Sequence, residues 1–287
     1  MIQFVIIRPT YTGHADAEGL RAIGWTDEDI AYYQENGVNW NEEDDEYHKV
    51  SDDNKALYGV LTASNISSYR DRIVYLPKID TSKVTDMSHI FQNCCSLAAI
   101  PMLDTSKVTN MYGMFYCCHS LTSIPMFDTS NVTNMGDMLG NCHLLTGIPM
   151  LNTINVTDIS SMLRNCYRLT AIPQLDTSNV TSIKGMFLNC YSLTSIPQLD
   201  TSNVTSMLNM FQNCYSLTNV NLKNVKLAYQ LNNSTFLSKD SILYLINNEA
   251  STSAITIKLA SYAYDRWATD ADIIAALANH PNISISK

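Results

Sequence analysis

The chain repeats every 24 residues over about half of its length. One set of prolines and one set of cysteines keep this spacing: Pro77, Pro101, Pro125, Pro149, Pro173 and Pro197, and Cys94, Cys118, Cys142, Cys166, Cys190 and Cys214. A fixed period of this length is typical of a solenoid, in which each repeat forms one coil stacked on the last. The sequence therefore predicts a stack of about six equivalent coils rather than a globular domain.

Apolar residues follow the same period. Four such columns begin at Val84, Ile90, Leu97 and Ile100, and each recurs 24 residues further on with little change of side chain. A single coil has too little apolar surface to fold alone, so neighbouring coils must bury one another. These columns are the predicted core.

One repeat, residues 176–199, predicts the shape of a coil. Apolar residues at i, i+3, i+4 and i+7 are typical of one face of a short helix; they are Ile183, Met186, Phe187 and Cys190. Residues 193–196 then predict a short strand, which Pro197 ends because proline lacks the N–H that a ladder needs. The expected fold is an α/β solenoid with short parallel strands and short helices.

The repeat also carries a recognisable motif. A segment C-x-x-L-T-S-I-P is followed by D-T-S-N-V-T-x-M-x-x-M-F-x-N-C, most clearly in residues 176–199 and 200–220. This pattern covers residues 77–222 and resembles the BspA-like leucine-rich repeats of bacterial surface proteins. The resemblance implies a right-handed solenoid, exposure at the cell surface, and adhesion to partner proteins.

The two flanks are expected to cap the solenoid, because an open end exposes apolar side chains and strand edges. The predicted domains are an acidic N-terminal cap over residues 1–76, the solenoid over 77–223 and a C-terminal α/β cap over 224–287. In the C-terminal flank we expect a helix over 239–248, capped by Ser238, and a second helix capped by Thr269 that runs to about residue 279. We also expect strands over 254–259 and 283–286. In the N-terminal flank we expect a strand in residues 1–8 and helix starts at Thr26 and Ser51.

The formal net charge is −9. Nucleic-acid binding needs clustered lysine and arginine, so this charge argues against it and against docking to an anionic membrane. No apolar run approaches a membrane span, and residues 1–8 do not resemble a signal peptide. The compartment and export route stay open.

Two metal sites are weaker alternatives. The 24-residue period predicts that the cysteine column is a buried row of free thiols. The alternative is a zinc site formed by Cys95, Cys117, Cys118, Cys142, His119 and His143, of which Cys95 and Cys117 lie outside the column. The acidic run 41–46 predicts a solvated loop, with calcium binding as the alternative although the EF-hand glycine is absent. We expect neither metal nor cofactor.

Signatures of catalysis are missing. The sequence contains no G-x-S-x-G, H-E-x-x-H, P-loop or G-x-G-x-x-G motif. Residues 122–123, 146–147, 170–171 and 194–195, on the predicted strand face, are small and neutral and offer no titratable pair for acid–base chemistry. The chain is not expected to be an enzyme.

One column combines imidazole and phenol rings at the predicted corner between helix and strand: His119, His143, Tyr167, Tyr191 and Tyr215. Aromatic rows favour contact with protein or sugar, although the same rings could simply shield the core. A second column changes from methionine to glutamine, which indicates partial exposure: Met102, Met126, Met150, Gln174 and Gln198. Together these columns are the candidate recognition surface.

The expected function is a non-enzymatic, surface-exposed, adhesin-like module that recognises protein or glycan. A structural part of a larger assembly, such as a phage tail or cell envelope, is the alternative. A repeated fold supplies a surface rather than a chemistry, so the ligand stays unidentified.

Overall fold

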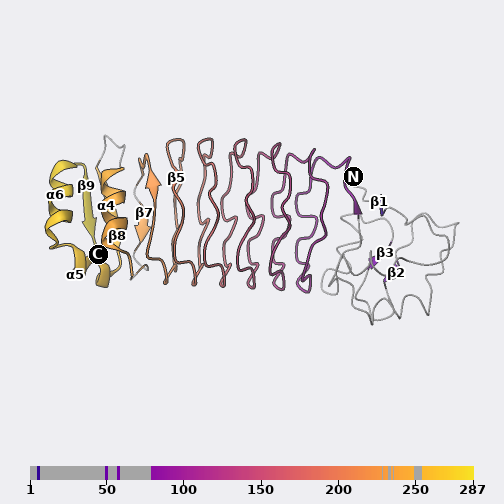
Figure 1. Cartoon of the computed structure of the whole chain (residues 1–287), viewed down its shortest axis with the longest axis horizontal. Coiled ribbons are helices and arrows are strands. Elements are labelled where there is room, and N and C mark those ends of the chain that lie inside the picture. Colours follow the sequence, from indigo (N-terminus) through magenta and orange to yellow (C-terminus); the bar gives the residue numbers. More distant parts are fainter. Residues whose placement is uncertain are drawn as a thin grey trace.

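The structure is a computed structural model that describes residues 5–6, 49–50, 57–58, 79–227, 229–231, 234, 236–248 and 254–287. Its coils lie side by side in a nearly straight row along the long axis, with the C-terminal helices at one end (Figure 1). The fold is solenoid-like, and its axis follows the chain from coil to coil. The predicted stacking of equivalent repeats is therefore present.

Regular strands are few and short. Two antiparallel pairs belong to the N-terminal part: β1 (Val5–Ile6) with β4 (Ile79–Asp80), and β2 (Lys49–Val50) with β3 (Leu57–Tyr58). Parallel pairing joins β5 (Leu199–Asp200) to β6 (Leu222–Lys223), and joins β7 (Tyr229–Leu231), β8 (Ile255–Leu259) and β9 (Ile283–Ser286) in that order.

The predicted strand over residues 193–196 is reduced to a single parallel bridge, between Ser195 and Asn219. A more regular column of bridges runs through another part of the coil, at positions 86, 110, 134, 158, 182 and 206. Threonines beside this column reinforce it: the backbone N–H and the hydroxyl of Thr181 both donate to the carbonyl of Thr157, at 2.8 and 3.0 Å. Coil-to-coil hydrogen bonds therefore replace an extended sheet.

The predicted short helix in each coil is wrong. Between residues 81 and 227 the structure has no helix; the segment expected to be helical is a chain of tight turns. Every second N–H donates to the next coil, as from Ser161 to Lys184 at 2.8 Å, and the N–H groups between them donate three residues back, as from Arg164 to Ser161 at 3.0 Å. An α-helix would instead satisfy its own groups four residues back.

Positive φ angles explain why turns replace the helix. Two positions per coil, four residues apart, adopt φ between 51° and 63°, as at Ser161 and Asn165. Asparagine and glycine tolerate this left-handed region better than other residues, and a helix interior excludes it. The asparagine before each column cysteine, present in five of six repeats, is the sequence signal for this turn.

The asparagine side chains also form a ladder across the coils. Nδ2 of Asn213 donates to Oδ1 of Asn189, and Asn189 donates to Asn165, each at 2.6 Å. Asn165 donates in turn to Asn141, whose Nδ2 reaches Sγ of Cys117 at 3.3 Å. A polar file of this kind holds neighbouring coils in one register.

The core fills the inside of the coils. All four predicted apolar columns are buried, except that Ile148 is only partly buried. Phenylalanines stack inside at ring-centroid distances of 5.6 Å (Phe91 with Phe115) and 5.9 Å (Phe187 with Phe211). Buried threonines tie the coils together from inside the turns, as Thr177 does by donating its hydroxyl to the carbonyl of Asp200 at 2.8 Å.

The C-terminal elements agree closely with the sequence predictions. Helix α4 (Lys239–Asn247) begins after Ser238, whose side chain accepts from the N–H of Ser241. Strands β8 and β9 lie where strands were expected. Helix α6 (Ala271–Asn279) is capped by Asp270 rather than Thr269, and α5 (Ser261–Trp267) was not predicted.

Predictions for the N-terminal flank are mostly untested. The strand expected in residues 1–8 includes β1. The helix expected after Ser51 is wrong at residues 57–58, which lie in β3. The helix start at Thr26 and the acidic run 41–46 lie outside the described residues.

Candidate recognition surface

The five predicted ring residues form one continuous stack. Ring centroids are 4.3 Å apart between His119 and His143, 4.5 Å between His143 and Tyr167, 5.0 Å between Tyr167 and Tyr191, and 5.6 Å between Tyr191 and Tyr215. The rings are nearly parallel, with interplanar angles from 5° to 19°. Because each coil contributes one ring at the same position, the distance between coils sets this spacing.

Exposure increases along the stack. His119, His143 and Tyr167 are partly buried, whereas Tyr191 is 39% and Tyr215 is 49% exposed. Burial, and next to it the neighbouring His119, lowers the pKa of His143, while burial raises the pKa of Tyr167. Both shifts favour the uncharged form of these two side chains at neutral pH.

The stacked geometry limits what the rings can recognise. A sugar packs against an open aromatic face, but each inner ring here has both faces covered by its neighbours. The ring edges, which carry the hydroxyl and imidazole nitrogen atoms, are left for contact with a partner, although the Tyr215 hydroxyl also donates to Oδ1 of Asn213 at 3.1 Å. The column is therefore better suited to a row of hydrogen bonds than to sugar stacking.

The methionine and glutamine column lies seven positions further along each coil. Met102, Met126 and Met150 are 63%, 63% and 64% exposed. Seven residues span at most ~23–25 Å even when fully extended, which sets the largest separation of the two columns along a coil. They are two separate rows rather than one patch.

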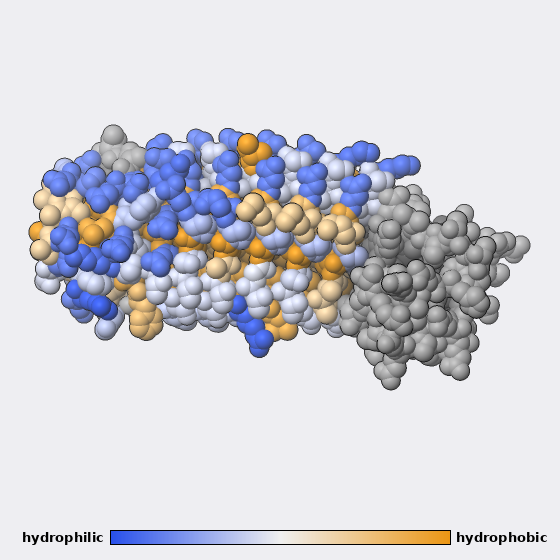
Figure 2. Space-filling view, viewed as in Figure 1, coloured by the Kyte–Doolittle hydropathy of each residue, from blue (hydrophilic) through white to orange (hydrophobic). Residues whose placement is uncertain are grey.

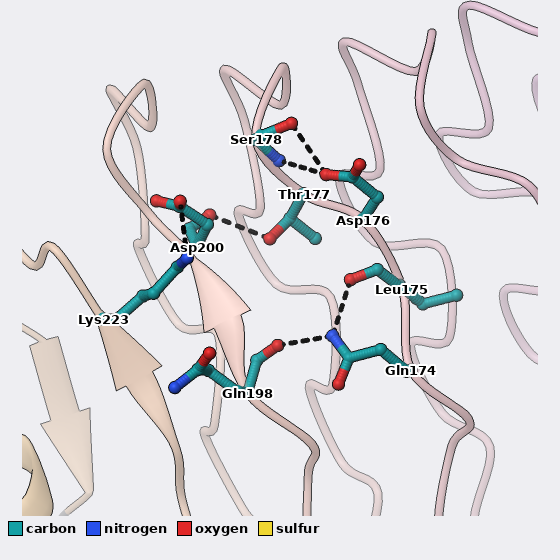
Figure 3. A pocket seen from close by; sticks show the side chains of 8 residues that line it. All are labelled: Gln174, Leu175, Asp176, Thr177, Ser178, Gln198, Asp200 and Lys223. Atoms are coloured by element: carbon teal, nitrogen blue, oxygen red, sulfur yellow. Dashed lines mark hydrogen bonds and ion pairs between the residues drawn. The ribbon is translucent and has the colours of Figure 1, made fainter.

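A shallow hollow of about 440 Å³ interrupts the second column where glutamine replaces methionine (Figure 3). Nε2 of Gln174 donates to the carbonyl of Gln198 on the next coil at 2.7 Å and to its neighbour Leu175 at 3.0 Å. Gln198 donates to the hydroxyl of Tyr244 in α4. Both glutamines are thus anchored to the backbone or to the C-terminal helix.

Charged side chains line the upper part of this hollow in Figure 3. Nζ of Lys223 lies 3.2 Å from Asp200, its strand partner. Burial of Asp200 opposes its ionisation, but hydrogen bonds from Asn224, Ser202 and Lys223 outweigh burial and lower its pKa to about 2. The Asp200 carboxylate is therefore charged at any physiological pH.

Sequence reasoning missed a polar cluster on the turn side of the coils. Nη2 of Arg164 donates to the hydroxyl of Tyr116 at 2.7 Å and lies 3.6 Å from Asp137, which accepts from Tyr112 at 3.3 Å. Burial raises the pKa of Asp137, although Arg164 opposes the shift. The tyrosines lie over glycines: a β-carbon at Gly136 would come within 3.0 Å of Tyr112. The sequence signal for this cluster was a glycine, such as Gly136, at a position where the other coils carry a larger residue.

The cysteine column is buried as predicted. Each thiol from Cys118 to Cys214 donates to a carbonyl in the preceding coil at 3.0–3.3 Å. Burial raises the pKa of Cys166 and Cys214 to about 12. Since the thiolate is the reactive form, these cysteines are inert packing residues.

The alternative zinc residues do not converge. Cys118 and Cys142 donate into the core, whereas the His119 and His143 rings stack outside it. Across the part of the chain that the structure describes, no group of three or more His, Cys, Asp or Glu side chains could hold a metal ion. Nor is any helix in that part both long and apolar enough to cross a membrane.

Comparison with known proteins identifies the family to which the chain belongs. Residues 63–148 and 143–242 both match DUF285, described as a Mycoplasma protein of unknown function. The chain belongs to the DUF285 family. The two matches together cover residues 63–242, which is well over half of the chain. With the stacked coils, DUF285 membership supports a leucine-rich-repeat-like relationship.

Other comparisons are distant. No curated protein matches the chain. Among solved structures, the crystal structure of an internalin C2 from Listeria monocytogenes is similar at 14% identity and a TM-score of 0.24, covering 57% of this chain and 85% of that one. This similarity is too distant to place any residue.

Proposed function

We propose that this DUF285 chain is a non-enzymatic, adhesin-like binding module at the cell surface, with residues 77–223 as the binding solenoid and the flanks 1–76 and 224–287 as its caps. The stack of rings from His119 to Tyr215 carries this proposal, because it repeats one hydrogen-bonding edge from coil to coil. A repeated row of this kind suits a partner with an extended surface, and protein is the favoured ligand.

The chemistry of the chain supports binding rather than catalysis. The thiols of the cysteine column are buried, those of Cys166 and Cys214 have raised pKa values, and the His119 and His143 rings stack on each other. General acid–base catalysis needs a titratable pair within hydrogen-bond reach of a substrate. The favoured use of these side chains is therefore recognition.

Replacing Tyr167, Tyr191 and Tyr215 together by phenylalanine should abolish most binding while the fold persists. Phenylalanine keeps the stack but removes three hydroxyls, each contributing about 0.5–1.5 kcal/mol in a typical hydrogen bond. We expect a loss of affinity of at least about tenfold. The measurement is binding to an array of matrix proteins and glycans, followed by calorimetry on each hit.

Two comparisons make this test decisive. Circular dichroism and urea unfolding of the triple variant must match the wild type, and the same substitution at Tyr262, exposed in α5, serves as the control. Hits that bind wild type and triple variant equally would remove the ring stack as the recognition surface. Hits confined to glycans would contradict the preference for protein.

A further inference from the structure

The second surface column has a chemistry of its own. Met102, Met126 and Met150 place one long apolar side chain per coil in solvent. Scattered exposed apolar residues are normal, but an aligned row marks a contact surface, and methionine adapts its shape to a partner. Figure 2 shows one face of the molecule, on which hydrophobic residues lie in a row along the coils with hydrophilic residues beside them.

A row of carboxylates runs beside the methionines. Two positions after them the coils carry Asp104, Asp128, Asn152, Asp176 and Asp200. The residue between the two rows is buried in every coil, so the backbone alternates and both rows face outward, ~7 Å apart. Hydrogen bonds from Ser130 lower the pKa of Asp128, and those from Ser178 lower the pKa of Asp176, so both stay ionised.

The spacing of the rows matches a helix. Ring centroids one coil apart are separated by 4.3–5.6 Å, which measures the coil repeat. Successive turns of an α-helix rise by ~5.4 Å, whereas same-face residues of a strand lie ~6.8 Å apart. A helix lying along the solenoid axis therefore places one apolar side chain on each methionine.

Given the proposed binding function, we propose that the methionine–aspartate strip, defined as Met102, Met126 and Met150 with Asp104, Asp128 and Asp176, binds a cationic amphipathic helix of a partner protein. The apolar stripe of the helix packs on the methionines, and its lysines or arginines pair with the carboxylates. Phosphate-rich partners are excluded because the carboxylates repel them.

The methionine–aspartate strip ends at the hollow formed by Gln174 and Gln198, because glutamine replaces methionine there. Three coils offer methionine, and the next two offer amides bound to the backbone and to α4. The helix therefore needs three consecutive apolar turns, with a polar residue beyond them. Lys223 ends the carboxylate row with the opposite charge, so a cationic residue is disfavoured there.

The test uses the full chain and synthetic peptides of about 18 residues, five helical turns. One peptide carries a leucine stripe flanked by lysines, and its partner carries glutamates in place of the lysines. Calorimetry should give saturable, equimolar binding of the lysine peptide, weakened by added salt. Binding of the glutamate peptide should be at least about tenfold weaker.

The chain supplies its own matched variants. Methionine-to-glutamine changes at 102, 126 and 150 copy the native Gln174 and Gln198, and Asp128→Asn copies the native Asn152, so neither should disturb the fold. We expect the glutamine triple to reduce affinity by about tenfold or more, and Asp128→Asn to reduce the salt dependence. Gln174→Met should tighten binding by lengthening the stripe.

Failure of this proposal is separable from failure of the proposed function. The tyrosine-to-phenylalanine triple leaves the strip intact and should bind the lysine peptide normally. Equal binding of the two peptides, or a folded glutamine triple with unchanged affinity, would overturn the strip while leaving the ring stack to its own array test. Loss of array binding in the glutamine triple, with the ring variant unaffected, would assign the whole binding function to the strip.

Discussion

Truncating Leu169 to alanine should lower the free energy of unfolding by about 2–5 kcal/mol. Leu169 is fully buried, with the equally buried Leu145 and Leu193 in the coils on either side. Coil-to-coil hydrogen bonds hold those neighbours at a fixed spacing, so the cavity cannot collapse, and the cost should lie in the upper half of the range.

Urea unfolding of the two proteins measures this cost directly. Arg168→Ala is the matched control, because Arg168 is the preceding residue and is exposed; it should change stability by less than about 0.5 kcal/mol. An unchanged midpoint for Leu169→Ala would count against the buried leucine column. A larger loss for Arg168→Ala than for Leu169→Ala would mean that the register is shifted by one residue.

Removing a whole repeat should be tolerated better than removing half of one. Deletion of residues 131–154 joins Ser130 to Asn155, which occupies the same position in its coil as Asn131. All columns then come back into register, and the stack loses only one coil and one interface. We expect a folded, cooperative and somewhat less stable protein.

Deletion of residues 131–142 should abolish folding although it removes half as many residues. In the full deletion, the buried Ile159, Met162 and Leu163 take the positions of Met135, Met138 and Leu139. The shorter deletion joins Ser130 to His143 and leaves these three core positions unfilled, at about 2–5 kcal/mol each, against a total stability of ~5–15 kcal/mol. Circular dichroism and thermal unfolding compare the two deletions. If the half-coil deletion were the more stable, the 24-residue coil would not be the structural unit.

The core could be predicted from the sequence because burial follows position in a repeat. Columns such as Leu121, Leu145 and Leu169 appear as identical letters at a fixed interval, and stacking is the arrangement that brings them together. The ring stack followed from the same logic, since His143 and Tyr167 occupy one column in adjacent coils.

The backbone inside each coil was not predictable from apolar spacing. Ile183, Met186, Phe187 and Cys190 satisfy a helical period, but a chain of turns places the same side chains inward. Gly185 and Asn189, both with φ near 62°, select the turns. The apolar period indicates which side chains are buried, whereas glycine and asparagine at fixed positions indicate the backbone angles.

The polar details of the surface depend on departures from the repeat. Arg164 and Tyr116 meet across two coils, and Gly140 makes room because a β-carbon there would lie 3.0 Å from the Tyr116 ring. No column contains this cluster, so pattern analysis could not find it. Likewise, only the structure shows that Gln174 is held by the carbonyl of Gln198 and that Gln198 is held by the hydroxyl of Tyr244.

An experimental crystal structure of the chain tests the stacking of equivalent coils most directly. It should place Leu121, Leu145 and Leu169 in one internal file, with the rings of Tyr167 and Tyr191 about 5.0 Å apart on the outside and turns rather than helices between residues 81 and 227. Leucines dispersed over separate sites, or helices in place of the turn ladder, would contradict this account.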